Sequence, residues 1–223
     1  MSVGVTQVIL SPGSRGSAGV ASRCADAQNT GMIRRFVLLA FLVLAGCHHN
    51  LSAQDTNVRG LIPKLAFNMT DARTGKPVNA GNFNGKVTLL FFGYTHCPDE
   101  CPVTMYNLTR VFKIMGPLAA GMQVLFVTVD PTRDTAAVLN RYTALFGPNF
   151  IGLRGNANQL YKLARRYRVV FTVVKKPVYS VTHSAAVYVF NAQGRPRFII
   201  AGLDTTRADI QGTAADLSAV ARE

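Results

Sequence analysis

The chain has 223 residues, of which 48% are hydrophobic and 16% charged, which suits one globular domain plus extra terminal sequence and leaves little room for a second domain. Its formal net charge of +13 would fit a nucleic-acid-binding protein, but no zinc-finger spacing, RNP-like strand or basic heptad region accompanies the charges. We therefore expect no nucleic-acid partner, and instead a solvated basic face, an acidic protein partner or an anionic lipid surface. The densest basic group comprises Arg165, Arg166, Arg168, Lys175 and Lys176.

A targeting signal follows Met32, where two arginines precede a short apolar run and then small residues. The run is far below the roughly 20 apolar residues needed to span a bilayer, so we predict a signal peptide at 32–46. Residues 1–31 precede the charged start of this signal and are interpreted as a spurious or disordered leader.

The signal ends in Leu-Ala-Gly-Cys, which resembles the bacterial lipobox. We expect lipidation of Cys47 and a membrane-anchored lipoprotein of the bacterial cell envelope, facing the periplasm or the outer side of the cytoplasmic membrane. The alternative is an ordinary cleaved signal or an uncleaved anchor, with Cys47 incidental. Residues 47–62 are predicted to form a polar tether, and 63–223 the folded domain.

The domain alternates strand and helix patterns. It opens with a hairpin whose strands, 65–69 and 77–78, flank a polar turn. Apolar runs predict strands at 87–93, 123–129, 150–153, 169–174, 185–190 and 196–200. Helical spacing predicts helices near 108–115, 138–146, 160–167 and 210–220. Alternating strands and helices indicate a parallel sheet core, and the last hairpin adds antiparallel edge strands, so we predict a three-layer α/β domain with a mixed central sheet.

Two cysteines remain in this domain, because Cys24 precedes the signal and Cys47 is assigned to the anchor. Cys97 and Cys101 lie where the buried strand 87–93 leads into a helix, and in open α/β sheets sites form at the carboxyl ends of strands. In an exported protein such a pair forms a disulfide, a redox couple or a metal site.

The helix that follows is expected to tune these thiols. Pro102 suits its first turn and places Cys101 at the N-cap, where the helix dipole lowers a thiol's pKa. The spacing from Cys97 permits a disulfide, and it also lets both sulfurs face one ion. Soft thiolates favour Cu(I), and an added imidazole extends the site to Cu(II), whereas structural zinc usually takes four protein ligands.

Three segments together resemble the Sco/SenC proteins, over a stretch from about residue 62 to 221. They are the cysteine loop at 93–102, Val-Asp-Pro-Thr-Arg-Asp-Thr at 129–135, and Val-Thr-His-Ser at 181–184. They occur in the family's order. The resemblance implies a thioredoxin-like fold and a copper chaperone for cytochrome c oxidase assembly.

The resemblance also implies the ligand set: thiolates from Cys97 and Cys101, and an imidazole from His183. It implies delivery of copper to the Cu(A) centre, with the oxidase subunit that carries Cu(A) and a copper donor protein as partners. The alternatives are a thiol:disulfide oxidoreductase or a redox sensor that uses the two cysteines as a redox-active pair. A pure oxidoreductase has no evident need for His183, so we favour the copper chaperone.

Several neighbouring residues have open roles. Thr182 stands where many family members carry an acidic residue, which changes the surroundings of the imidazole. Asp130 ends a buried strand and is either a turn former or an acid that lies near the copper without binding it. His96 is interpreted as loop packing or thiol tuning rather than a fourth ligand, and Met105 and Met115 are expected in the core.

Overall fold

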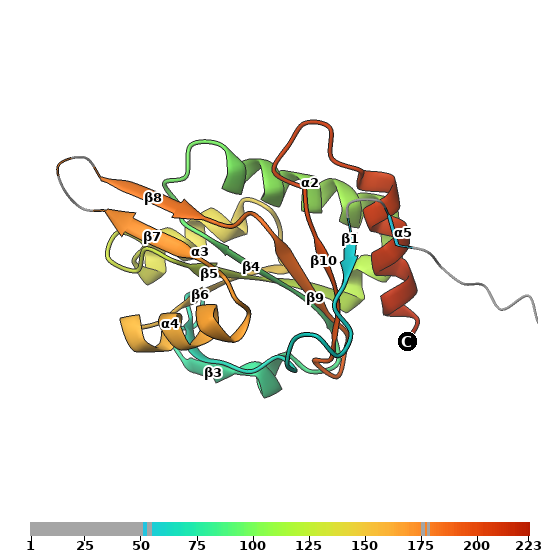
Figure 1. Cartoon of the computed structure of the whole chain (residues 1–223), viewed down its shortest axis with the longest axis horizontal. Helices are drawn as coiled ribbons and strands as arrows, with labels where there is room; N and C mark the ends of the chain where they lie inside the picture. Colours follow the sequence, from blue (N-terminus) through green and yellow to red (C-terminus); the bar gives the residue numbers. More distant parts are fainter. Residues whose placement is uncertain (1–50, 53–54, 175–176, 178) are drawn as a thin grey trace, which may run out of the picture. The chain divides into compact units, whose positions relative to one another are not determined.

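The structure is a computed structural model that describes residues 51–52, 55–174, 177 and 179–223 (Figure 1). The predicted leader, signal peptide and lipidation site at Cys47 lie outside the described residues and stay predictions. Within the described part, no helix combines the length and apolar character needed to cross a membrane.

An eight-stranded mixed sheet forms the centre of the described domain. Its strands are β1 (Asp55–Asn57), β2 (Asn68–Asp71), β3 (Pro77–Asn79), β4 (Val87–Gly93), β5 (Met122–Thr128), β6 (Phe150–Arg154), β9 (Val187–Phe190) and β10 (Pro196–Ile200). The order across the sheet is β1-β10-β9-β4-β5-β6-β2-β3. The three central strands β4, β5 and β6 are parallel, and the remaining pairs are antiparallel. The predicted mixed α/β fold class is confirmed.

Helices flank the sheet: in the view of Figure 1, α2 runs above it, α5 lies at its right-hand side and α4 lies below it. The α-helices are α2 (Glu100–Met115), α3 (Ala136–Ala144), α4 (Ala157–Arg166) and α5 (Ile210–Ala221). Short 3-10 helices are η1 (Ala80–Phe83) and η2 (Gly116–Gly121). Every residue of β4 and of β5 is buried, which explains why these strands read as unbroken apolar runs in the sequence.

A separate two-stranded ribbon leaves the main sheet beside the end of β4. It consists of β7 (Phe171–Val174) and β8 (Ser180–His183), with Phe171 opposite His183. The strand predicted at 169–174 therefore belongs to this ribbon, and its partner β8 was not predicted. Both strands alternate half-buried and exposed residues, as expected for a ribbon with one covered face.

The predicted tether contributes structure. Residues 55–57 form the edge strand β1, in which Asp55 lies opposite Ile200 of β10. The backbone N–H of Ser52 donates to a carboxylate oxygen of Asp216 at 2.8 Å, and Val58 is buried. The ordered domain thus begins before residue 63. A polar strand of three residues is too short to show an alternating pattern, and its partner β10 lies near the far end of the chain.

The carboxyl of Asp55 makes the stability of this edge depend on pH. Burial, followed by the hydrogen bond and charge of Asp216, raises the pKa of Asp55 from 3.8 to about 8. Between these two pH values the folded state keeps a proton on Asp55 that the unfolded state has lost. The contribution of Asp55 to the free energy of unfolding is therefore complete below pH 3.8 and is lost as the pH rises towards 8.

We expect Asp55→Asn to raise the thermal midpoint at pH 8 by about 4 °C or more, since about 2–4 °C corresponds to 1 kcal/mol in a domain of this size. At pH 4 the gain should be much smaller. Thermal unfolding followed by circular dichroism at both pH values measures this, with the loop variant Asp204→Asn as the control. Equal shifts at the two pH values would show that the Asp55 carboxyl is not protonated in the fold.

Candidate metal centre

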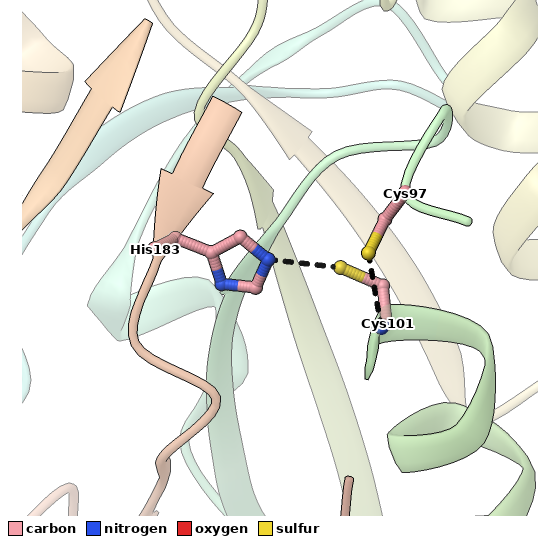
Figure 2. A group of neighbouring side chains, drawn as sticks. All are labelled: Cys97, Cys101 and His183. Carbon is pink, nitrogen blue, oxygen red and sulfur yellow. Dashed lines mark hydrogen bonds between the residues drawn. The ribbon is translucent and has the colours of Figure 1, made fainter. Parts of the chain in front are cut away.

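Two thiols and an imidazole converge at the carboxyl end of β4 (Figure 2). Cys97 lies in the loop after β4, Cys101 in the first turn of α2, and His183 at the end of β8. The Sγ atom of Cys101 lies 3.2 Å from Nε2 of His183, although the two residues are 82 positions apart in the chain. The ligand atoms of all three residues lie within 4.8 Å of one another, and both cysteines are free thiols. The fold therefore brings together the three residues that the sequence predicted as ligands.

The start of α2 differs from the prediction. The helix begins at Glu100 with Asp99 as its N-cap, so Cys101 lies inside the first turn and not at the cap. Cys101 is also fully buried. The neighbouring Cys97 sulfur and then burial raise the pKa of Cys101, and the prediction that this thiol has a lowered pKa is wrong.

Cys97 has the lowered pKa instead. A hydrogen bond from the Cys101 thiol contributes most, and it outweighs burial; backbone N–H groups of Cys101 and Asp99 add to it and bring the pKa of Cys97 to about 4. The Cys101 N–H lies 3.4 Å from the Cys97 sulfur. Cys97 is only partly buried. The site therefore presents an accessible thiolate and, behind it, a buried thiol that must lose its proton when a metal binds.

The imidazole is held in one tautomer. Nδ1 of His183 lies 3.0 Å from the backbone carbonyl oxygen of Ser184, and since a carbonyl only accepts, Nδ1 carries the proton. The lone pair of Nε2 then faces the Cys101 sulfur. The rings of Phe91 and Tyr94 stand nearly edge-on to the imidazole, at centroid distances of 6.1 and 5.8 Å. The histidine is thus set up to act as a ligand through Nε2.

Thr182 has less influence on the imidazole than the sequence implied. It is exposed and lies opposite Thr172 in the ribbon, and successive side chains of a strand point to opposite faces. The backbone of Ser184 provides the hydrogen bond that sets the tautomer of His183. An acidic residue at position 182 is therefore not needed for this purpose.

Gly93 makes room for the site at the end of β4. A Cβ atom at this position would lie 2.9 Å from the Cys101 sulfur and 2.8 Å from the ring of Phe126. Both contacts are too short for a side chain. The glycine of the cysteine loop is therefore required by the close approach of Cys101 to the strand.

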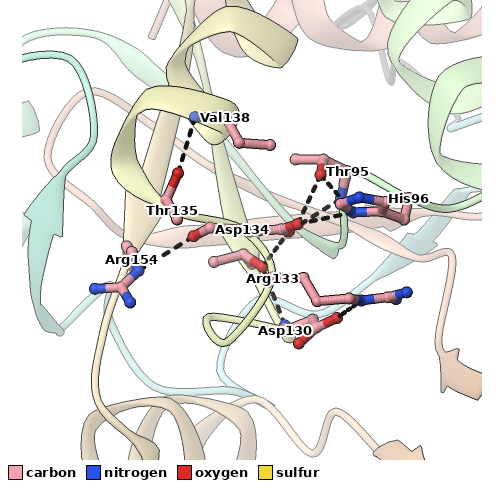
Figure 3. A network of polar contacts seen from close by, with 9 residues as sticks. Thr95, His96, Asp130, Arg133, Asp134, Thr135, Val138 and Arg154 are labelled. Carbon is pink, nitrogen blue, oxygen red and sulfur yellow. Dashed lines mark hydrogen bonds and ion pairs between the residues drawn. The ribbon is translucent and has the colours of Figure 1, made fainter. Parts of the chain in front are cut away.

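A buried carboxylate anchors the cysteine loop (Figure 3). Asp134 is fully buried and accepts hydrogen bonds from the Thr95 N–H at 3.0 Å, the Thr95 hydroxyl at 2.6 Å and the Thr128 hydroxyl at 2.5 Å. It also lies 3.4 Å from Nδ1 of His96. Asp134 was not predicted as a site residue, and its only signal was its place in the segment 129–135 that carries the family resemblance.

Asp130 lies one step further from the three ligands. Its burial would raise its pKa, but the Tyr179 hydroxyl and the Arg133 guanidinium favour the charged form and hold the pKa below its usual range. Nε of Arg133 lies 2.6 Å from the carboxylate, and the guanidinium stacks 3.7 Å above the ring of Tyr179 and 5.9 Å from that of Tyr94. Asp130 contacts Arg133, which lies over the ring of Tyr94. Tyr94 in turn contacts His183. The predicted role of Asp130 as an acid close to the copper ligands stays a prediction.

The remaining candidates have structural places. The ring of His96 lies 3.1 Å from the Thr95 hydroxyl and is half exposed, so it packs on the loop rather than joining the three ligands. Met105 and Met115 are buried in the core, as predicted.

A sequence model of the family described as SCO1/SenC matches residues 62–218. The chain belongs to the SCO1/SenC family. A curated SCO1/SenC relative is the mitochondrial protein SCO2 homolog of Bos taurus, which is 39% identical over 133 residues; the match covers 57% of this chain and 50% of the relative. The chain thus spans about half the length of this relative.

Solved structures of SCO1/SenC proteins share the thioredoxin-like fold. Bradyrhizobium japonicum ScoI, solved with copper bound, is 36% identical with a TM-score of 0.61, and the match covers 70% of this chain and 98% of that one. Apo Sco1 of Thermus thermophilus is 32% identical with a TM-score of 0.65, covering 78% of this chain and 99% of that one. The predicted thioredoxin-like fold is confirmed.

Proposed function

We propose that this protein binds copper through Cys97, Cys101 and His183 and delivers it to the Cu(A) centre during cytochrome c oxidase assembly. The observation that carries the proposal is the convergence of two sulfurs and one imidazole nitrogen within 4.8 Å. Two thiolates favour Cu(I), and the imidazole makes Cu(II) acceptable too. The copper bound to Bradyrhizobium japonicum ScoI supports the choice of metal.

The oxidase as destination rests on the family. One solved structure is described as that of a member of the Sco family of cytochrome c oxidase assembly proteins. It is 19% identical to this chain, and at this identity the match shows only the shared fold. The expected partners are the oxidase subunit that carries Cu(A) and a copper donor protein. Lipidation of Cys47 would hold the protein at the outer side of the bacterial membrane. Mass analysis of the mature N-terminus tests this modification.

The two sulfurs have different parts in transfer. Cys97 is partly exposed and its pKa of about 4 makes it a thiolate at neutral pH, so a partner's sulfur can reach the metal beside it. Cys101 is buried behind it and His183 holds the third position through Nε2. Copper can then leave by ligand exchange, in which the partner's sulfur first replaces Cys97 and the bonds to Cys101 and His183 are replaced last.

Copper loading of the full chain under reducing conditions tests the proposal. We expect one copper per chain in the wild type, and loss of tight binding in Cys97→Ser and in Cys101→Ser. Met105→Leu is the matched control, because it removes a buried sulfur from the same helix at nearly constant volume and should load fully. A wild-type protein that binds no copper yet rapidly reduces a partner's disulfide would favour the oxidoreductase instead.

Delivery is tested separately by mixing the copper-loaded protein with a copper-free Cu(A) domain, separating the two and measuring the copper content of each. We expect copper to appear in the acceptor. Retention of all copper by the donor would contradict the delivery role while leaving the binding site intact.

A further inference from the structure

A long stretch of the chain carries positive charge without any carboxylate. Between Asp134 and Asp204 there is no aspartate or glutamate. The lysines and arginines of this stretch are Arg141, Arg154, Lys162, Arg165, Arg166, Arg168, Lys175, Lys176, Arg195 and Arg197. The stretch includes α4 and both strands of the ribbon that carries His183. A surface of one sign attracts partners of the opposite sign and speeds their encounter.

A mixed aromatic and basic surface lies within this stretch. We call it the α4–β7 patch, and it consists of Tyr161, Arg165, Arg168, Val170 and Phe171. Tyr161 is 57% exposed and Val170 76% exposed. Tyr161 and Arg165 are four residues apart on α4 and share a helix face, and the Tyr161 ring stacks on Phe171 at 5.4 Å and 22°. Exposed aromatic rings beside arginines are typical of protein–protein interfaces.

The patch adjoins the metal centre through the ribbon. Phe171 of β7 lies directly opposite His183 of β8, and opposite residues of an antiparallel pair place their side chains on the same face. The ring stack of Tyr161 on Phe171 continues this row onto α4. A molecule that covers Tyr161 and Phe171 is therefore held beside the imidazole ligand.

Arg168 occupies a strained position in the patch. Its φ of 57° is the only positive φ of a non-glycine residue in the part of the chain that the structure describes. The residue follows the last turn of α4, where the Val169 N–H bonds to the Ala164 carbonyl at 2.9 Å and the Arg168 N–H to the Arg165 carbonyl at 3.3 Å. This is the Schellman arrangement, in which glycine is favoured because it has no Cβ.

An arginine at a position where glycine folds more easily points to a use for its charge. Its side chain is exposed, and its guanidinium has no hydrogen bond or ion pair within the described residues that would offset the strain. Arg165 is likewise exposed. Both charges are therefore available to a partner.

We propose that the α4–β7 patch is the docking surface for an acidic region of the protein that exchanges copper with this one. The inference rests on the proposed function and adds where the partner binds and the sign of its charge. A protein fits better than an anionic membrane, because a bilayer on the patch would cover the approach to the metal centre, whereas an acceptor protein must reach it.

The experiment uses the copper-loaded full chain and a copper-free Cu(A) domain as the acceptor, at low and high ionic strength. We expect Arg165→Glu to lower the second-order transfer rate about ten-fold at low salt, because charges at the rim of an interface act mainly on the association rate. Lys113→Glu on α2 carries the same charge change outside the patch and should transfer at the wild-type rate. Copper stoichiometry should be unchanged in both variants.

Arg168→Gly separates charge from strain. It should raise the thermal midpoint by about 2–4 °C, because it relieves the left-handed conformation, and yet slow the transfer several-fold. Arg168→Lys should keep most of the wild-type rate. A residue that serves only the fold would not give higher stability together with slower transfer.

Binding of the acceptor to the copper-free protein, measured by calorimetry, tests the surface even if no copper moves. Weaker binding of Arg165→Glu than of Lys113→Glu supports the proposal. Equal binding and equal rates for these two variants would overturn it, as would transfer that is independent of salt. It would also be overturned if Arg165→Glu lost only its binding to anionic vesicles. Failure of the wild type to load copper would count against the proposed function and not against the patch.

Discussion

Replacing His183 with alanine is expected to lower the affinity for copper by more than about 100-fold, since loss of a residue that merely orients a ligand already costs about 10–100-fold. The variant removes the Nε2 donor that lies 3.2 Å from the Cys101 sulfur. His96→Ala is the matched control, because His96 lies on the same loop as Cys97 but turns towards Thr95 and Asp134. It should bind copper as the wild type does.

Competition titrations with a Cu(I) chelator measure both affinities, and the absorption of the Cu(II) form gives a second reading of the ligand set. The Cu(II) spectrum should change in His183→Ala and stay the same in His96→Ala. Unchanged affinity and spectrum in His183→Ala would exclude the three-ligand site. Loss of copper in His96→Ala alone would move the imidazole ligand to the cysteine loop.

Replacing Asp134 with alanine is expected to lower the free energy of unfolding by about 3 kcal/mol or more. The change leaves the Thr95 N–H and the Thr128 hydroxyl without their acceptor in a buried place, and each buried unsatisfied group costs about 1–3 kcal/mol. Such a loss is large against the roughly 5–15 kcal/mol that hold a domain together. Copper affinity should also fall by about 10–100-fold, because Thr95 and His96 lead directly into Cys97.

Asp130→Ala is the matched control for this prediction. Asp130 is as buried as Asp134 and lies in the same turn, but its partners Arg133 and Tyr179 are both partly exposed, and the Arg133 guanidinium stays hydrated when the carboxylate is removed. Its loss should be nearer 1 kcal/mol, with a small effect on copper. Urea unfolding and chelator competition measure the two quantities. Equal losses of unfolding free energy and of copper affinity in both variants would show that Asp134 stabilises the cysteine loop no more than Asp130 does.

The strands and helices of the core followed from sequence periodicity. The strand predicted at 87–93 is β4 residue for residue, and the strand predicted at 123–129 differs from β5 by one position at each end. These segments are buried on both faces, so the apolar pattern alone defines them. The N-terminal hairpin was also predicted from the polar turn between its strands, but its first strand is Asn68–Asp71 rather than 65–69, and Asn68 lies opposite Asn79.

Other parts were beyond the reach of local patterns. β1 has three residues and pairs with β10 across most of the chain, so no local pattern marks it. β8 has four residues of mostly polar character and pairs with the neighbouring β7, and it lacks the apolar run by which the other strands were recognised. The N-cap of α2 is another such case, because Pro102 is compatible with more than one position in a first helical turn. The error of two residues reversed the expected thiol chemistry, since it is Cys97 that accepts the helix N–H and Cys101 that is buried.

The chemical groups available to this protein could be read from its residues: two thiols at the end of a buried strand, and a histidine identified through a family pattern. How these groups are arranged follows from the fold. It placed the Nε2 lone pair of His183 against Cys101, gave the anionic role to Cys97 and used Asp134 to fix the loop. Protonation and ligand geometry depend on burial and on hydrogen bonds between distant segments, and a linear pattern does not contain these contacts.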